Sequence, residues 1–151
     1  MSRVTRHWLG VVLWMGLIFL MSTDLGSSAH TSRIIEPLVR WLNPEISSAA
    51  LAWVHFLVRK AGHLSEYAIL ALLLLRAIRA SRRLTPDMWS WKTAGLALLV
   101  AAAYAATDEY HQSFVAARTA SLTDVLIDTT GALMAVGLAF LFRKKRAPPR
   151  L

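Results

Sequence analysis

The sequence predicts an all-α fold, namely a polytopic membrane protein built as a four-helix transmembrane bundle. Hydrophobic residues make up 56% of the 151 residues, and the mean hydropathy of +0.45 lies above the values typical of soluble domains. Twelve of the 17 Lys and Arg residues gather at the two termini and in the segment 76–92, which leaves long apolar stretches between them. Composition and charge pattern therefore indicate the same class of protein.

The first predicted span covers residues 8–23 and follows Arg3 and Arg6, which are the flanking bases expected of a membrane helix. A cleaved signal peptide is the alternative, because the small residues 27–29 resemble a cleavage site. We prefer the span, because a bundle of four helices needs this segment.

Residues 34–42 predict a short interfacial amphipathic helix between the first two spans. The segment 22–32 before it is rich in Ser, Thr and Gly and is interpreted as a loop. Apolar residues then recur at helical spacing, with Arg33, Glu36 and Arg40 between them. This helix is either a lid over the bundle or an ordinary connector.

The second predicted helix begins at Asn43-Pro44, which resembles an N-cap followed by proline at the first helical position. It runs to about Ala80 and would be on the order of 50 Å long, which exceeds the thickness of a bilayer. Its beginning must therefore protrude or tilt, and only residues 54–76 are expected to cross.

The third predicted span covers residues 92–109. Thr85-Pro86 repeats the pattern of a cap followed by proline and predicts that its helix begins there. The span is rich in alanine and ends in the polar residues 108–112.

The fourth predicted span covers residues 122–142. Ser121 and Asp124 have the spacing of a capping box, and Gly131 and Gly137 predict close packing against a neighbouring helix. With the other three spans it completes a single transmembrane domain over residues 1–146, followed by a disordered tail, 147–151.

The charges also predict an orientation and exclude some functions. Because bases favour the cytoplasmic side, both termini are expected in the cytoplasm. The net charge of +8 is carried beside apolar runs and not along a patch of bases and aromatic residues, so no nucleic-acid partner is expected. The absence of Cys excludes a disulfide framework, a thiolate metal site and a Cys nucleophile.

Ionisable side chains interrupt the apolar helices at a common depth. Lys60, His63 and Tyr67 share one helical face, with Glu66 beside them. Counted from the basic clusters at 1.5 Å per residue, Lys60, Asp108 and Asp128 all lie about 22–24 Å away. Because unpaired charges are costly inside a bilayer, these groups should face each other or a wet cavity that opens to the outer side.

Two structural interpretations of this constellation stay open. The charges could form buried salt bridges that only set the register of the helices. Asp124 could likewise be no more than a member of the capping box. Either reading would leave the constellation without a chemical role.

Four groups of residues resemble the VanZ-like family over nearly the whole chain. They are Ile18-Phe19-Leu-Met-Ser22, Lys60-x-x-His63-x-x-Glu66-Tyr67, Asp108-Glu109-x-x-Gln112-x-Phe114, and Arg118-x-x-Ser121-x-x-Asp124 with Gly131 seven residues later. Two positions depart from the family: Asp128 stands where the family usually has Asn, and Ala116-Ala117 stand where it usually has Pro-Gly.

The resemblance implies a small multi-pass protein of the bacterial inner membrane, in a family named for a teicoplanin-resistance factor. The family is distantly similar to membrane enzymes that exchange or remove lipid head groups. This favours an enzyme that acts at the outer leaflet on a membrane lipid or lipid-linked cell-wall precursor, through a phosphoester bond. The resemblance links such a protein to glycopeptide resistance or cell-envelope metabolism.

The candidate roles follow from the chemistry of a phosphoester. His63 is the candidate nucleophile or general base, with Glu66 or Asp108 as its orienting carboxylate. Glu109 is grouped with these catalytic candidates, and Glu109 and Gln112 would position a head group or water. The cations Lys60 and Arg118 are expected to bind phosphate oxygens. Tyr67 and Asp124 complete the predicted substrate-binding set.

No cofactor is predicted, although a divalent cation held by Asp108, Asp124 and Asp128 is a second possibility. A protein that only binds a lipid or a glycopeptide is a third hypothesis. The fourth is a small proton-coupled transporter, since carboxylates and histidines also relay protons. Replacement of His63 by Gln separates catalysis from simple binding.

Overall fold

The computed structural model describes residues 1–23, 28–85, 88–115 and 120–143, without the side chains of 28–30. In its described part every regular element is a helix and there is no strand, which confirms the all-α prediction. The helices are α1 (Arg3–Ser22), α2 (Ser28–Leu42), α3 (Ser48–Ser81), α4 (Trp91–Gln112) and α5 (Leu122–Leu141).

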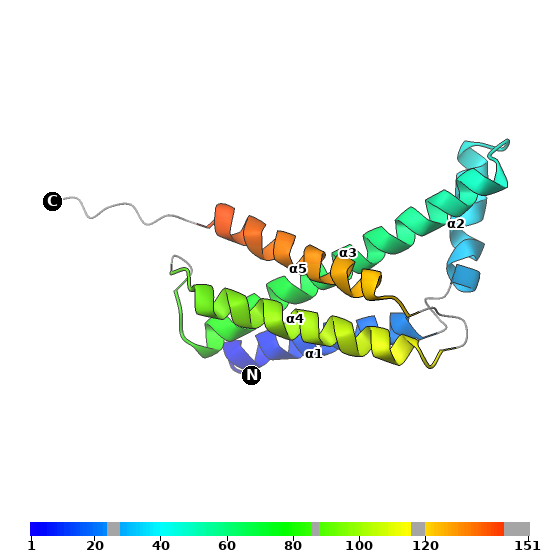
Figure 1. Cartoon of the computed structure of the whole chain (residues 1–151). Coiled ribbons are helices and arrows are strands. Elements are labelled where there is room, and N and C mark those ends of the chain that lie inside the picture. Colours follow the sequence, from blue (N-terminus) through cyan, green and yellow to red (C-terminus); the bar gives the residue numbers. More distant parts are fainter. Residues whose placement is uncertain (24–27, 86–87, 116–119, 144–151) are drawn as a thin grey trace.

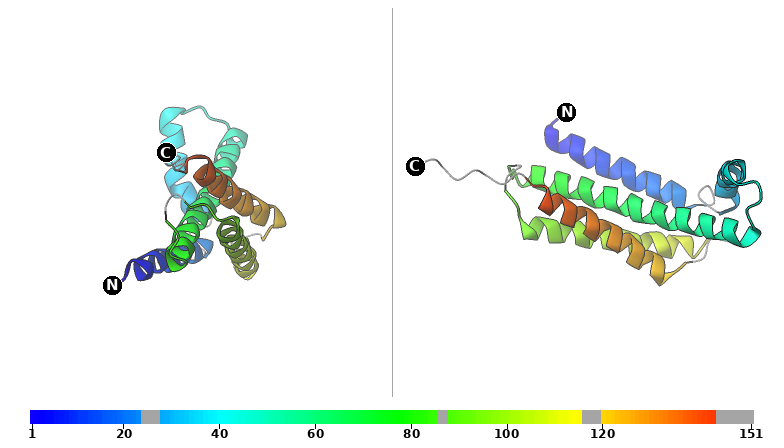
Figure 2. Two further views of the ribbon diagram at one scale, coloured as in Figure 1. Left: turned by 90° about the vertical axis from the view of Figure 1, so that its left-hand side faces the viewer. Right: turned by 90° about the horizontal axis from the view of Figure 1, so that it is seen from above.

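Helix α3 is the axis of the molecule, because it contacts each of the other four helices. Helices α1, α3, α4 and α5 alternate in direction, so the beginning of α1, the end of α3 and the end of α5 lie at one end (Figure 1). Helices α1 and α5 lie on opposite sides of α3 and have no contact with each other in the described residues (Figure 2). Helix α2 lies across the other end of the bundle, against α3.

Small and polar side chains share the interior with a few large apolar ones such as Ile18, Leu70 and Leu74, and many other large apolar side chains lie on the outside. Ala97, Ala101 and Ala105 recur every fourth residue along α4 and are fully buried, so they allow the neighbouring helices to approach closely. In contrast, Val12, Leu99 and Leu133 are all more than half exposed. Soluble monomers rarely expose apolar surface on this scale, whereas a membrane protein presents it to lipid.

Three of the helices in the described part, α1, α3 and α5, are long and apolar enough to cross a membrane. These helices make the chain a membrane protein. Helix α4 is not among them, although it was predicted as the third span. Its apolar stretch is largely alanine, and Asp108 and Glu109 lie in its last turn. The four-span bundle and the interfacial position of α2 therefore stay predictions.

Three predicted helix ends are wrong. Helix α2 begins at Ser28, inside the segment interpreted as a loop. Helix α3 begins at Ser48 and not at Asn43-Pro44, which lie in the turn before it. Helix α4 begins at Trp91, beyond the predicted start at Thr85-Pro86.

The two late starts share one cause, which is a serine that caps the helix. The side chain of Ser47 accepts a hydrogen bond from the backbone N–H of Ala50, and Ser90 does the same for Thr93. The first backbone N–H groups of a helix have no acceptor within the helix. The hydroxyl of a serine at the N-cap accepts a hydrogen bond from one of these groups, whereas a proline at the first position offers no side-chain acceptor. The serines therefore set these ends.

Two glycines of α5 were predicted to allow close packing, and only one does. A Cβ atom at Gly131 would lie 2.2 Å from the carbonyl oxygen of Leu64 on α3, so only glycine fits there. A Cβ atom at Gly137 would meet nothing within 4 Å, so the prediction for that residue is wrong. Gly131 fixes the closest approach of α3 and α5 beside the polar residues described below.

We predict that Gly131→Ala lowers stability and that Gly137→Ala does not. The added methyl group at Gly131 forces α5 away from the α3 backbone, at a cost of about 1–3 kcal/mol. Gly137→Ala adds the same group in open space and should gain up to about 1 kcal/mol from helix propensity. Thermal unfolding of both variants in detergent, followed by circular dichroism, measures this. An equal shift for both variants would contradict the packing role of Gly131.

Candidate functional site

A cavity of about 360 Å³ lies between α1, α2, α3 and α4. Its apolar wall comes from Ile18 of α1, Ile35 of α2 and Phe56 and Val58 of α3. Its polar lining comes mainly from α3 and the last turn of α4. The polar and ionisable residues that line it are Ser22, Thr31, His55, Arg59, His63, Glu66, Asp108 and Gln112.

His63 lines this cavity and has a carboxylate behind it. Its Nδ1 atom lies 3.2 Å from Oδ1 of Asp128 on α5, and the Asp128 side chain is completely buried. Because Nδ1 faces the carboxylate, Nε2 is the ring nitrogen left for a molecule in the cavity. This is the arrangement of a base and the group that orients it. The orienting carboxylate is Asp128, whereas the sequence analysis assigned that role to Glu66 or Asp108.

Asp124 binds the two cations that precede His63 on α3. Its carboxylate accepts a hydrogen bond from Nζ of Lys60, and its second oxygen lies 3.6 Å from a guanidinium nitrogen of Arg59. Lys60 is thereby held against α5, and it does not line the cavity. Arg59 both contacts Asp124 and lines the cavity, so it is the described cation that a ligand there meets.

Glu109 caps α5 in place of Asp124. Its Oε1 atom accepts a hydrogen bond from the backbone N–H of Ser121 at 2.5 Å. The Ser121 side chain accepts from the N–H of Thr123, so the predicted N-cap is confirmed. The predicted capping box is wrong, because the carboxylate that reaches the cap N–H comes from another helix. Neither Glu109 nor Asp124 lines the cavity.

Asp108 and Gln112 lie one turn apart at the end of α4 and both line the cavity. Nε2 of Gln112 donates a hydrogen bond to Oδ2 of Asp108 at 3.1 Å. Their other oxygens, Oδ1 of Asp108 and Oε1 of Gln112, are buried and accept no hydrogen bond from the described residues. Buried polar atoms are nearly always satisfied, so these two oxygens are suited to water or a polar ligand.

The remaining predicted residues lie in three different places. Glu66 lines the cavity beside His63. Tyr67 is fully buried and does not line the cavity; its ring centroid lies 6.3 Å from that of Tyr104, and its hydroxyl has no hydrogen-bond partner among the described residues. Arg118 lies outside the described residues.

Sequence reasoning missed Arg59 and His55 as residues of the site. Arg59 directly precedes Lys60, and helical geometry alone does not say which of two consecutive bases faces a carboxylate. His55 was not among the predicted site residues, and it lines the cavity. Helix α2 closes one side through Thr31 and Ile35, which favours the lid over the ordinary connector.

The carboxylates proposed for a divalent cation face different partners. Asp124 faces Lys60 and Arg59, while Asp128 faces His63. No three His, Asp or Glu side chains of the described residues are placed to hold one metal ion. The geometry therefore offers no support for the metal-assisted alternative.

Fold and site together define a helical membrane protein with a polar cavity between its helices. The family model VanZ/LLP1 matches residues 7–143, so the chain belongs to the VanZ/LLP1 family, as its motifs predicted. Neither the curated proteins nor the solved structures contained a match.

We predict that Asp124→Leu destabilises the protein far more than loss of an exposed ion pair. The substitution leaves Lys60 and Arg59 without their carboxylate in a partly buried place, at a cost of about 2–4 kcal/mol. Glu36→Gln is the matched control, because Glu36 and Arg40 form an exposed pair on α2 at 2.8 Å. That loss should cost less than about 1 kcal/mol. Similar unfolding temperatures for both variants in detergent would contradict this account of Asp124.

Proposed function

We propose that this chain is a membrane enzyme that acts on a lipid-linked phosphoester at the outer leaflet. In this proposal α1, α3, α4 and α5 cross the bacterial inner membrane as one transmembrane domain, with both termini in the cytoplasm. Helix α2 lies in the outer interface over the cavity. The distribution of bases supports the orientation, because the ends of α3 and α5 and the beginning of α1 carry them.

The observation that carries the proposal is the pair of His63 and Asp128. A buried carboxylate 3.2 Å from Nδ1 holds the imidazole in one orientation and stabilises its charged form. A histidine that served only to fill the core would not need to line a cavity. The cation Arg59 on the same wall gives phosphate oxygens a donor with the planar geometry that suits them.

The proposed reaction is a transfer or hydrolysis at phosphorus. Nε2 of His63 takes the proton from an attacking hydroxyl group as its oxygen forms the new bond to phosphorus. The bond from phosphorus to the departing head-group oxygen breaks, and that oxygen receives the proton back from His63. Arg59 holds the phosphate oxygens, on which negative charge increases in the transition state. Asp108 and Gln112 orient the hydroxyl or the head group through their unsatisfied oxygens.

The charge balance of the site narrows the class of head group. On α3, α4 and α5 at this end of the molecule, the described carboxylates outnumber the described cations: Glu66, Asp108, Glu109, Asp124 and Asp128 stand against Arg59, Lys60 and the imidazole of His63. A ligand with only negative charge would add to that excess. A head group with both a phosphate and an amine would place its phosphate at Arg59 and its amine near Asp108 and Glu66. We therefore propose a zwitterionic head group as the preferred substrate.

We predict that His63→Gln abolishes a lipid change that the native protein causes. Mass spectrometry of lipids and lipid-linked precursors compares cells that lack the protein with cells that overproduce it. A head group that changes between the two names the reaction. His63→Gln should lower that conversion about 10²- to 10⁴-fold, which is the usual contribution of a general base.

The control is His111→Gln, because His111 lies at the same end, contacts Ser22 through Nδ1 at 3.3 Å and does not line the cavity. This variant should keep its activity. Equal activity of His63→Gln and the native protein, with both present in membranes, would refute the enzymatic proposal. A protein that only binds its ligand would tolerate His63→Gln and leave all lipids unchanged.

We further predict that Asp128→Leu and Asp128→Asn differ in activity. An asparagine side chain can accept a hydrogen bond from Nδ1 of His63, whereas leucine cannot. The Asn variant should therefore retain part of the conversion, and the Leu variant should lose as much as His63→Gln does. The same lipid assay measures both. Equal losses would show that the charge of Asp128, and not its orienting bond, is what His63 needs.

A further inference from the structure

A second cavity, of about 410 Å³, lies at the opposite end of the molecule from His63. Helices α1 and α5 flank α3 there without touching each other, so the cavity is a gap over the surface of α3. Among the residues that the structure describes, five basic side chains line it: Arg3 and His7 of α1, Arg76 and Arg79 of α3, and Arg143 just after α5.

No carboxylate of the described residues lines this cavity. The ion pairs that the structure describes all lie elsewhere, on α2 or between α3 and α5 near His63. Arg3 and Arg76 form no ion pair within the described residues. Two guanidinium groups therefore face the same gap without a described counter-ion, and they repel each other unless an anion lies between them.

The other two arginines shape the cavity. Arg79 donates hydrogen bonds to the carbonyl oxygens of Thr85 and Met88, at 2.8 and 3.0 Å, and so holds the connection between α3 and α4 in place. The guanidinium carbon of Arg143 lies 3.6 Å from the ring centroid of Phe140. Both interactions fix cationic groups at the rim.

The cavity also has an apolar wall, made by Leu72, Leu75, Leu84 and Ala139. The aromatic rings of Trp89, Trp91 and Phe140 form a cluster beside it, with centroids 4.8–5.6 Å apart. Tryptophan is enriched where a membrane meets water, so this cluster indicates the level of the lipid head groups. Apolar wall and guanidinium groups thus meet at the depth where a phospholipid changes from acyl chain to phosphate.

We propose that this second cavity binds an anionic phospholipid of the inner leaflet. Its phosphate lies between Arg3 and Arg76, and an acyl chain runs along Leu72 and Leu75. Basic pockets between membrane helices bind such head groups on the cytoplasmic side of other membrane proteins. A free phosphate ion would use the guanidinium groups and leave the apolar wall empty. The proposal shares with the proposed function the orientation of the chain in the membrane, and it does not depend on catalysis at His63.

Native mass spectrometry of the full chain in detergent, titrated with palmitoyl-oleoyl phosphatidylglycerol, tests this site. Loss of one basic side chain near the membrane surface should weaken lipid binding about fivefold. We therefore expect this loss for Arg76→Gln and for Arg3→Gln. Both side chains are exposed at the rim, so neither substitution should unfold the protein. Phosphatidylcholine should be retained less well than phosphatidylglycerol by the native chain.

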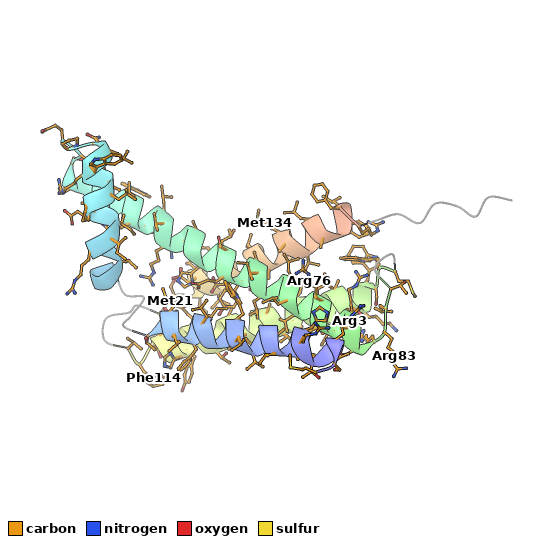
Figure 3. The ribbon with its side chains drawn as sticks, turned by 180° about the vertical axis from the view of Figure 1, so that it is seen from behind. Arg3, Met21, Arg76, Arg83, Phe114 and Met134 are labelled. Atoms are coloured by element: carbon orange, nitrogen blue, oxygen red, sulfur yellow. The ribbon has the colours of Figure 1, made fainter. Side chains whose placement is uncertain are left out.

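Arg83→Gln is the matched control. Arg83 lies beyond the end of α3, at the same end of the molecule as Arg3 and Arg76, and does not line the cavity (Figure 3). It carries the same charge, so its replacement should leave phosphatidylglycerol binding unchanged. Equal weakening by all three variants would overturn the proposal, because it would show diffuse attraction and no site.

Two other outcomes would also overturn it. Equal retention of phosphatidylcholine and phosphatidylglycerol would show that the charge of the head group is not recognised. Displacement of the lipid by millimolar inorganic phosphate would show a site for free anions and no lipid site. Activity at His63 plays no part in any of these measurements, so their failure leaves the catalytic proposal unaffected.

Discussion

The structure depends on one constraint, which is that every charge placed among apolar helices must find a partner inside the bundle. Lipid offers no compensation for an ion, so the cost of an unpaired charge is several kcal/mol. The pairs between Lys60 and Asp124 and between His63 and Asp128 therefore do more than link α3 to α5. They define which face of each helix points inward, and Gly131 then brings the two backbones into contact at the same level.

This constraint joins the stability of the protein to its chemistry. Asp124 neutralises the cations of α3, Glu109 caps α5, and Asp128 faces His63, which lines the cavity. Of the two structural interpretations that the sequence left open, the salt-bridge interpretation holds for part of the constellation, and the capping-box interpretation of Asp124 is wrong. Some charges of the constellation are structural, and others line an enclosed space. The two groups differ in whether their side chains line the cavity. Even neighbouring residues differ in this respect, because Arg59 lines the cavity and Lys60 does not.

The sequence was sufficient to predict the helices, the family and the common depth of the ionisable side chains, because periodicity, motifs and composition carry that information. It could not predict the helix starts, since a serine cap outweighed the proline pattern at both α3 and α4. It also could not assign partners between helices. Glu109 takes the capping role that spacing gave to Asp124, because the rotation of α4 relative to α5 is set by packing and leaves no local signal.

Arginines near the two ends of α3 have different surroundings and therefore suit different roles. Arg59 lies beside Asp124, so its charge is largely balanced before any ligand arrives, and it can only assist in binding a phosphate. Arg76, toward the other end of α3, has no carboxylate near it in the described residues and lies in a gap that the helices do not fill. A balanced cation suits a substrate that must leave after reaction, because tight binding of the ground state gains nothing in rate. A cation without a neighbouring carboxylate suits a lipid that stays bound to the protein.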